Sequence, residues 1–142
     1  MTELKEKLEK IAKEYSLAEI YVFGSRAKEV AARVAGMKVP CDQLVADVDI
    51  GVRPKKGRVL SARDKVSIII ELEDLFDAPR VDLVLLPEAE AFLALEIIRG
   101  ELLYCEDADA QAWYELYVLR RAGDLLPLKK ERIRMIFQEG AK

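Results

Sequence analysis

The sequence contains no histidine among its 142 residues. This absence excludes Ser-His-Asp and Cys-His catalysis, and it also excludes the usual zinc ligand sets. Any catalysis has to use carboxylates, lysines, arginines and hydroxyls, together with a hard metal ion that prefers oxygen ligands. Cysteine is scarce as well, because Cys41 and Cys105 are two isolated thiols without metal-type spacing. We therefore expect a reduced, cytoplasmic protein.

Long hydrophobic runs and an excess of positive charge are also missing. No apolar segment approaches transmembrane length, and the first residues are too polar for a signal peptide. The formal net charge of −3 gives the molecule no electrostatic basis for wrapping nucleic acid. The chain is 51% hydrophobic and 35% charged, which is typical of a globular protein, and its length favours a single domain over residues 1–142.

The hydrophobic pattern predicts an α+β domain with a small mixed sheet flanked by helices. We expect strands over residues 19–23, 45–52 and 80–86, with a short extended piece at 102–104. Helices are predicted over 2–15, 28–35, about 62–76, 88–99 and 109–122, with a separate helical segment after Pro127. Ser61 and Asp64 form a capping-box pattern at the third helix. Its expected core face consists of Val66, Ile69, Ile70 and Phe76.

The strand over residues 45–52 carries the most distinctive polar pattern. Side chains alternate along a strand, so Asp47, Asp49 and Gly51 share one face. The other face carries Ala46, Val48, Ile50 and Val52. Two carboxylates held on one face of an apolar strand repel each other unless a cation or a proton lies between them. Because Gly51 has no side chain, we expect room beside them for a metal ion that carries a phosphate.

Two further features complete a candidate site. Gly24-Ser25 follows an apolar strand and opens a helix, which is the outline of a phosphate-binding turn. Asp82 lies inside a later apolar strand. Each feature alone is compatible with an ordinary turn or a solvated side chain, but three acids beside a phosphate turn can hold two divalent ions.

The sequence resembles the minimal nucleotidyltransferase (MNT) branch of the DNA polymerase beta superfamily. The resemblance rests on Gly24-Ser25-Arg26-Ala27, Asp47-Val48-Asp49 and Val81-Asp82-Leu83, and it extends through residues 96–104 into the C-terminal helices. It implies a nucleotidyltransferase fold, with a catalytic core over about 18–87 and a helical part over about 88–142. The sequence departs from the family at Ala46, where Ser or Thr is usual, and at Lys28-Glu29 after the turn, where Arg-Gly is usual. The link between the turn and the paired acids is also longer than usual.

The resemblance implies roles for six residues. Asp47, Asp49 and Asp82 would be the catalytic residues and would bind Mg²⁺, two ions in all, and Asp82 would also orient or deprotonate the attacking hydroxyl. Gly24 and Ser25 would hold the phosphates of ATP, and Arg26 would neutralise their charge; an alternative for Arg26 is a solvated surface arginine.

The resemblance implies the antitoxin of a toxin–antitoxin pair, which transfers AMP from ATP to a tyrosine of a toxin with a HEPN domain. One alternative is an antitoxin that masks its partner by contact alone, which Ala46 and the altered turn favour. Another is transfer to a small molecule such as an aminoglycoside, although 142 residues leave little room for the extra domain that such enzymes carry. The pattern leaves the oligomeric state open.

Overall fold

A four-stranded mixed sheet lies at the centre of the computed structural model, which describes residues 2–38 and 47–140. The strand order is β3-β2-β1-β4. The central strand β1 (Leu17–Phe23) runs antiparallel to β2 (Val48–Pro54) and to β4 (Glu101–Cys105). The edge strand β3 (Val81–Leu85) runs parallel to β2. The predicted mixed sheet is therefore confirmed.

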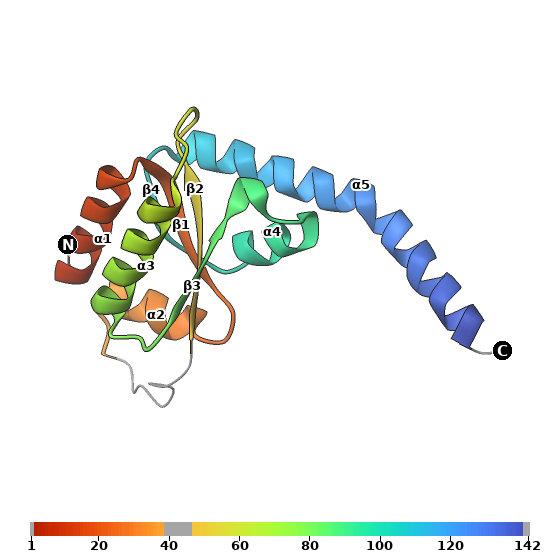
Figure 1. Ribbon diagram of the computed structural model, residues 1–142, viewed down its shortest axis with the longest axis horizontal. Coiled ribbons are helices and arrows are strands. Elements are labelled where there is room, and N and C mark those ends of the chain that lie inside the picture. Colours follow the sequence, from red (N-terminus) through yellow and green to blue (C-terminus); the bar gives the residue numbers. More distant parts are fainter. Residues whose placement is uncertain (1, 39–46, 141–142) are drawn as a thin grey trace.

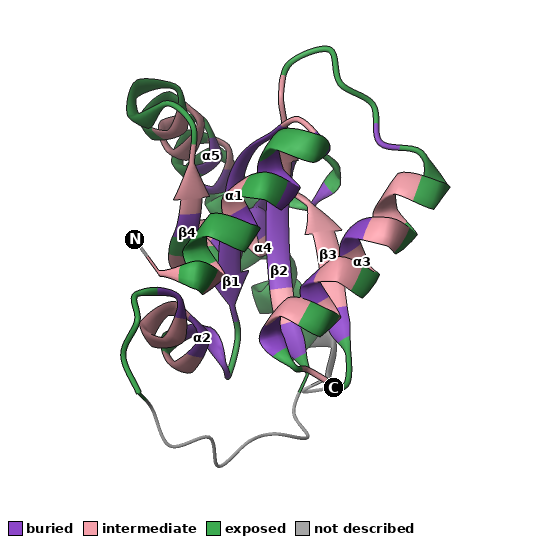
Figure 2. Cartoon of the chain, turned by 90° about the vertical axis from the view of Figure 1, so that its left-hand side faces the viewer, coloured by how far each residue is buried: buried purple, intermediate pink, exposed green. Residues whose placement is uncertain are grey.

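Helices cover both faces of the sheet (Figures 1 and 2). One face packs against α1 (Glu3–Glu14), α2 (Ala27–Val34) and α3 (Ala62–Phe76). The other face packs against α4 (Ala91–Ile98) and the first part of α5 (Ala108–Gly140). A short 3-10 helix, η1 (Leu86–Glu88), follows β3. Each face has its own hydrophobic core, so the sheet is the middle of three layers.

The alternation predicted for β2 is present. Val48, Ile50 and Val52 are fully buried in the core beneath α1, α2 and α3. Ala46, which was expected to share that face, lies outside the described residues, as does Cys41. The opposite face of β2 is turned toward α4 and α5, so Asp49, the acidic residue of this strand, lies on the side of the second, smaller core.

The start of α3 follows its sequence signal. The Ser61 hydroxyl accepts a hydrogen bond from the backbone N–H of Asp64 at 3.1 Å, and the Asp64 carboxylate accepts one from the Ser61 N–H at 3.0 Å. This is the predicted capping box.

The predicted core face of α3 was wrong in part. The buried residues are Ile68, Leu72 and Phe76, whereas Val66 and Ile70 are 55% and 52% exposed. Several apolar residues follow one another in this helix, so its pattern allowed more than one stripe. Packing against α1 and the sheet selected the stripe through Ile68 and Leu72.

The C-terminal helix also differs from the prediction. α5 continues from Ala108 to Gly140 through Pro127, instead of ending before the proline. Proline lacks the N–H that would bond to the carbonyl four residues earlier, and its ring crowds that carbonyl, so such helices bend. Figure 1 shows α5 bending after its middle and projecting beyond the body of the protein.

Candidate active site

The strand register brings two of the predicted acids together. Asp49 of β2 is paired with Asp82 of β3 in the parallel ladder. Both residues lie near the beginning of their strands, on the face that packs against α4 further along. Asp47 is exposed and immediately precedes β2. The structure therefore places these acids at one end of the sheet, where the strands enter it.

The Gly-Ser turn lies against the same acids. Phe23, the last residue of β1, is paired with Asp49, so Gly24 lies beside the Asp49 side chain. Gly24 has a φ of +80°, and a Cβ atom at this position would lie 2.5 Å from Oδ2 of Asp49. Only glycine allows this close approach without strain. Ser25 is exposed, and α2 begins two residues later, so the first N–H groups of α2 follow the turn directly in the sequence.

The electrostatics of the site centre on Asp49. Partial burial raises the pKa of its carboxyl group, and repulsion from Asp82, Asp47 and Glu96 raises this pKa further. Glu96 lies on α4, and sequence reasoning did not include it, because nothing in the local pattern shows which strand this helix covers. A bound cation would relieve this repulsion, and every candidate ligand is a carboxylate oxygen, the donor that Mg²⁺ prefers.

The acids are not arranged as a finished metal site. Within residues 2–38 and 47–140, no three acidic side chains converge closely enough to hold an ion. The Asp82 carboxylate instead forms an ion pair with Arg80, with 3.0 Å between Oδ1 and Nε. Both side chains are exposed, so this pair is weak and can exchange for a stronger partner. The donor types fit a divalent metal, but Asp82 has to turn away from Arg80 to bind one.

The space beside Gly51 was predicted wrongly. The sequence suggested that the missing side chain leaves room for a ligand, but Ile97 of α4 fills that position, so closely that an added Cβ would overlap it. Gly51 allows α4 to pack closely on the sheet instead. Ile97 therefore covers this face of β2 at Gly51. Asp49, two residues earlier in the strand, is the next side chain on the same face.

Arg26 is buried rather than solvated. Its side chain has no exposed surface and makes a two-pronged ion pair with Glu29, with Nε–Oε1 at 3.0 Å and Nη2–Oε2 at 2.9 Å. Glu29 also contacts Arg33, whose guanidinium donates to the Phe76 carbonyl. In this arrangement Arg26 holds the turn against the first turn of α2, and Arg33 connects α2 to the end of α3. A contact between Arg26 and phosphate remains a prediction.

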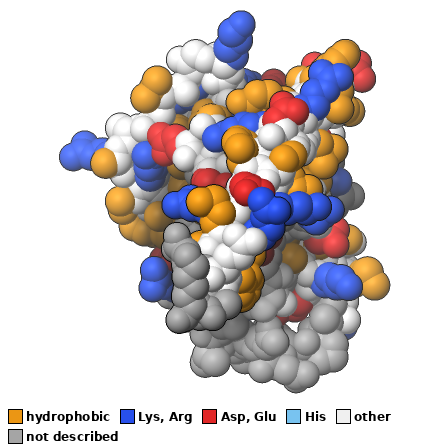
Figure 3. Space-filling view, turned by 90° about the vertical axis from the view of Figure 1, so that its right-hand side faces the viewer, with side chains coloured by type: hydrophobic (Ala, Val, Ile, Leu, Met, Phe, Trp, Pro, Cys, Tyr) orange, Lys and Arg blue, Asp and Glu red, His pale blue; other side chains and the backbone are white. Residues whose placement is uncertain are grey.

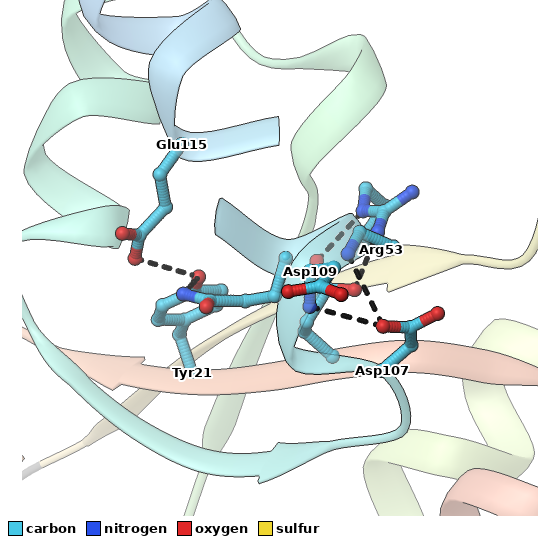
Figure 4. Close-up of polar contacts among 8 residues, drawn as sticks. Tyr21, Arg53, Asp107, Asp109 and Glu115 are labelled. Atoms are coloured by element: carbon cyan, nitrogen blue, oxygen red, sulfur yellow. Dashed lines mark hydrogen bonds and ion pairs between the residues drawn. The ribbon is translucent and has the colours of Figure 1, made fainter. Parts of the chain in front are cut away.

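A second polar cluster lies further along the same face of the sheet (Figure 4). The fully buried Glu19 of β1 binds the Arg53 guanidinium through both oxygens, at 2.7 Å and 2.5 Å. The Arg53 guanidinium also stacks on the Tyr114 ring of α5, 4.6 Å from its centre.

Tyr21 extends this cluster toward α5. Its hydroxyl donates to Glu115 at 3.0 Å and accepts from Gln111 at 2.9 Å. These contacts fix the start of α5 on the sheet. A charged residue inside the apolar segment 17–23 was the sequence signal for this cluster, and sequence reasoning did not use it.

An acidic pair on neighbouring strands, a glycine turn against it and a helix starting behind that turn define a nucleotidyltransferase-type domain. The family model described as "Polymerase beta, Nucleotidyltransferase" matches residues 6–109. The chain therefore belongs to this family, which confirms the predicted superfamily and fold. No match was found among curated proteins.

Several solved structures that align with this chain are toxin–antitoxin complexes. A mutant of the MntA–HpeT toxin–antitoxin aligns with a TM-score of 0.71 and 18% identity, covering 94% of this chain and 98% of the other. A toxin–antitoxin structure with AMP-PNP aligns at 0.67 and 18% identity, with the same coverage. A complex of tri-AMPylated HEPN toxin and MNT antitoxin from Shewanella oneidensis aligns at 0.61 and 22% identity, covering 95% and 94%. At these identities the likeness shows the shared fold.

Among the described residues, no helix has the length and apolar character required to cross a membrane.

Proposed function

We propose that this protein is a Mg²⁺-dependent nucleotidyltransferase that transfers AMP from ATP to a tyrosine hydroxyl of a partner HEPN toxin. The observation that carries the proposal is the pairing of Asp49 with Asp82 in the β2–β3 ladder, beside the turn at Gly24. The likeness to complexes that contain AMP-PNP or an AMPylated HEPN toxin supports the choice of nucleotide and of partner.

Three acids would bind metal and handle the proton. Asp47 and Asp49 would ligate Mg²⁺, and Asp82 would complete a two-ion site after it releases Arg80. When bound, Mg²⁺ neutralises phosphate charge and lowers the pKa of an attacking oxygen. The raised pKa of Asp49 supports this assignment, because carboxylates that repel one another favour a cation between them.

The turn after β1 would bind the phosphates. Gly24 lets the backbone approach an anion closely, Ser25 supplies an exposed hydroxyl, and the first N–H groups of α2 carry partial positive charge. A direct contact from Arg26 would require its guanidinium to leave Glu29. We therefore assign Arg26 first to positioning the turn and second to the phosphates.

The transfer step exchanges one ester bond for another. The tyrosine oxygen of the partner forms a bond to the α-phosphorus of ATP, and the bond from that phosphorus to the bridging oxygen of the leaving group breaks. Pyrophosphate leaves with that oxygen. The phenolic proton passes to a carboxylate of the site, for which Asp82 is the candidate because its side chain is 39% exposed and therefore accessible to a partner hydroxyl.

A masking antitoxin without transfer is the second candidate. It is favoured by the ion pair between Arg80 and Asp82 and by the burial of Arg26, since both arrangements hold site residues away from a nucleotide. The two candidates differ in one observable. Masking survives loss of the acids, whereas transfer does not.

The test is incubation with Mg²⁺ and α-labelled ATP, with and without the HEPN protein encoded by the neighbouring gene. Variants Asp49→Ala and Asp82→Ala are compared with Glu6→Gln, an exposed acid on α1 across the sheet. We expect label on the HEPN protein with the native chain and with Glu6→Gln, and its loss with either site variant. Absence of label, with tight binding that persists in both site variants, would establish masking instead.

A further inference from the structure

The C-terminal half of α5 extends the apolar stripe that packs on the body. Val118 and Ala122 are buried against the second core, and at 3.6 residues per turn Leu126, Ile133 and Ile136 continue along the same side. These last three are 41%, 44% and 59% exposed. Figure 1 shows this part of the helix projecting away from the sheet. A projecting helix is only marginally stable in water, so its apolar stripe favours a partner surface.

A groove of about 450 Å³ lies where this stripe passes α4. Its apolar floor is formed by Phe92 and Leu95 of α4 and by Leu126 and Ile133 of α5. Its rim is basic and consists of Arg99, Lys129 and Lys130. The Lys129 ammonium lies 4.0 Å above the Phe92 ring. Figure 3 views the molecule from the side to which α5 projects and shows hydrophobic side chains interspersed with charged side chains, lysines and arginines as well as acids.

The charge of this region decides which occupant fits. The charged side chains that line the groove are all cationic, namely Arg99, Lys129 and Lys130, although the net charge of the whole chain is −3. A second copy that placed its own α5 in the groove would bring two basic segments together, and that contact is repulsive. An apolar floor with a basic rim fits an amphipathic helix with acidic residues along its edges.

We propose that the groove between α4 and α5 is the docking site for an acidic, amphipathic helix of the partner HEPN toxin. This assignment rests on the partner named by the proposed function, but it does not depend on nucleotide transfer. In Figure 1 the distal part of α5 projects away from the body and bends downward, in the direction of the end of the sheet at which β2 begins. A partner held along this helix would therefore present its surface on the side of the acidic site.

The test measures binding of the full-length chain to the HEPN protein of the neighbouring gene by calorimetry, without ATP. Ile133→Asp places a charge on the groove floor, whereas the matched control Met135→Asp changes a residue of similar exposure, 52%, on the opposite side of α5. We expect Ile133→Asp to weaken binding about tenfold or more and Met135→Asp to leave it nearly unchanged. Lys130→Glu should weaken binding too, and high salt should weaken binding of the native chain.

Further measurements separate this inference from the proposed function. Circular dichroism and the melting temperature should match among the native chain, Ile133→Asp, Met135→Asp and Lys130→Glu, because all three substituted side chains are exposed. Binding that is lost with Ile133→Asp but kept with Asp49→Ala supports the groove, whether or not AMP is transferred. Equal loss with Met135→Asp, no effect of Ile133→Asp, or a self-associated native chain that Ile133→Asp converts to a monomer would overturn it.

Discussion

Replacement of Gly24 by alanine tests how closely the turn is built against the acidic site. Gly24 has a φ of +80°, and an added Cβ would lie 2.5 Å from Oδ2 of Asp49, 3.5 Å from its Cγ and 3.7 Å from its Cβ. Two separate penalties follow. The alanine has to adopt a left-handed backbone conformation, and the Asp49 carboxylate, which neighbouring acids already repel, has to move away from the added Cβ.

The magnitude of the loss can be divided between these penalties. A left-handed conformation costs about 1–2 kcal/mol for a residue with a Cβ. Alanine also reduces the conformational freedom of the unfolded chain, which offsets about 0.4–1 kcal/mol of the lost stability. Overpacking adds about 1 kcal/mol, at the low end of its range because a carboxylate at the end of a short side chain can rotate. We therefore expect Gly24→Ala to lower the free energy of unfolding by about 2 kcal/mol.

Gly57 provides the matched control. Its φ is +85°, but an added Cβ would meet no atom within 4 Å, so Gly57→Ala carries only the backbone penalty. Urea denaturation should show a loss of about 1 kcal/mol or less at Gly57 and the larger loss at Gly24. In a variant that already carries Asp49→Ala, Gly24→Ala should lower the free energy of unfolding no more than Gly57→Ala does. If the two glycine substitutions have equal effects, or if the effects of Gly24→Ala and Asp49→Ala simply add, the close contact between turn and site is refuted.

Two further predictions concern buried charge. Because burial and neighbouring carboxylates raise the pKa of Asp49 above its unfolded value, ionisation of this group opposes folding, and its unfavourable contribution grows as the pH rises from about 4. Asp49→Asn should therefore be more stable than the native chain at pH 7 in urea denaturation without metal, and the difference should vanish toward pH 4; a less stable variant at pH 7 would contradict this. Glu19→Gln leaves the Arg53 guanidinium without its buried carboxylate and should cost about 3 kcal/mol. Glu106→Gln removes the exposed pair of Glu106 with Lys55 and should lower the free energy of unfolding by less than about 1 kcal/mol. Equal losses in Glu19→Gln and Glu106→Gln would show that burial does not strengthen the pair of Glu19 with Arg53.

Features that depend on neighbours in the sequence were predictable. The capping box of Ser61 and Asp64 involves residues three positions apart, so its atoms meet wherever the helix forms. The alternation of buried and polar residues in β2 follows from strand geometry, which turns successive side chains to opposite faces. A strand with acids on one face and aliphatic residues on the other has only one way to bury its apolar side.

Features that depend on contacts between elements were not predictable in the same way. The side chain of Ile97 fills the space at Gly51, although the two residues belong to a helix and a strand far apart in the sequence. Glu96 raises the pKa of Asp49 for the same reason, since the packing of α4 sets the position of this carboxylate. No local pattern specifies which helix covers which strand, or in which register.

The sequence by itself determined the identity of the elements, the acidic face of β2 and the glycine of the turn, because each depends on the local backbone conformation or on a period of a few residues. Tertiary structure alone decided that Asp49 lies beside Asp82, that Ile97 fills the space at Gly51, and that Glu19 pairs with Arg53. These outcomes depend on strand register and on packing between layers. The free energy of such contacts is distributed over residues distant in the sequence, and no single segment encodes it.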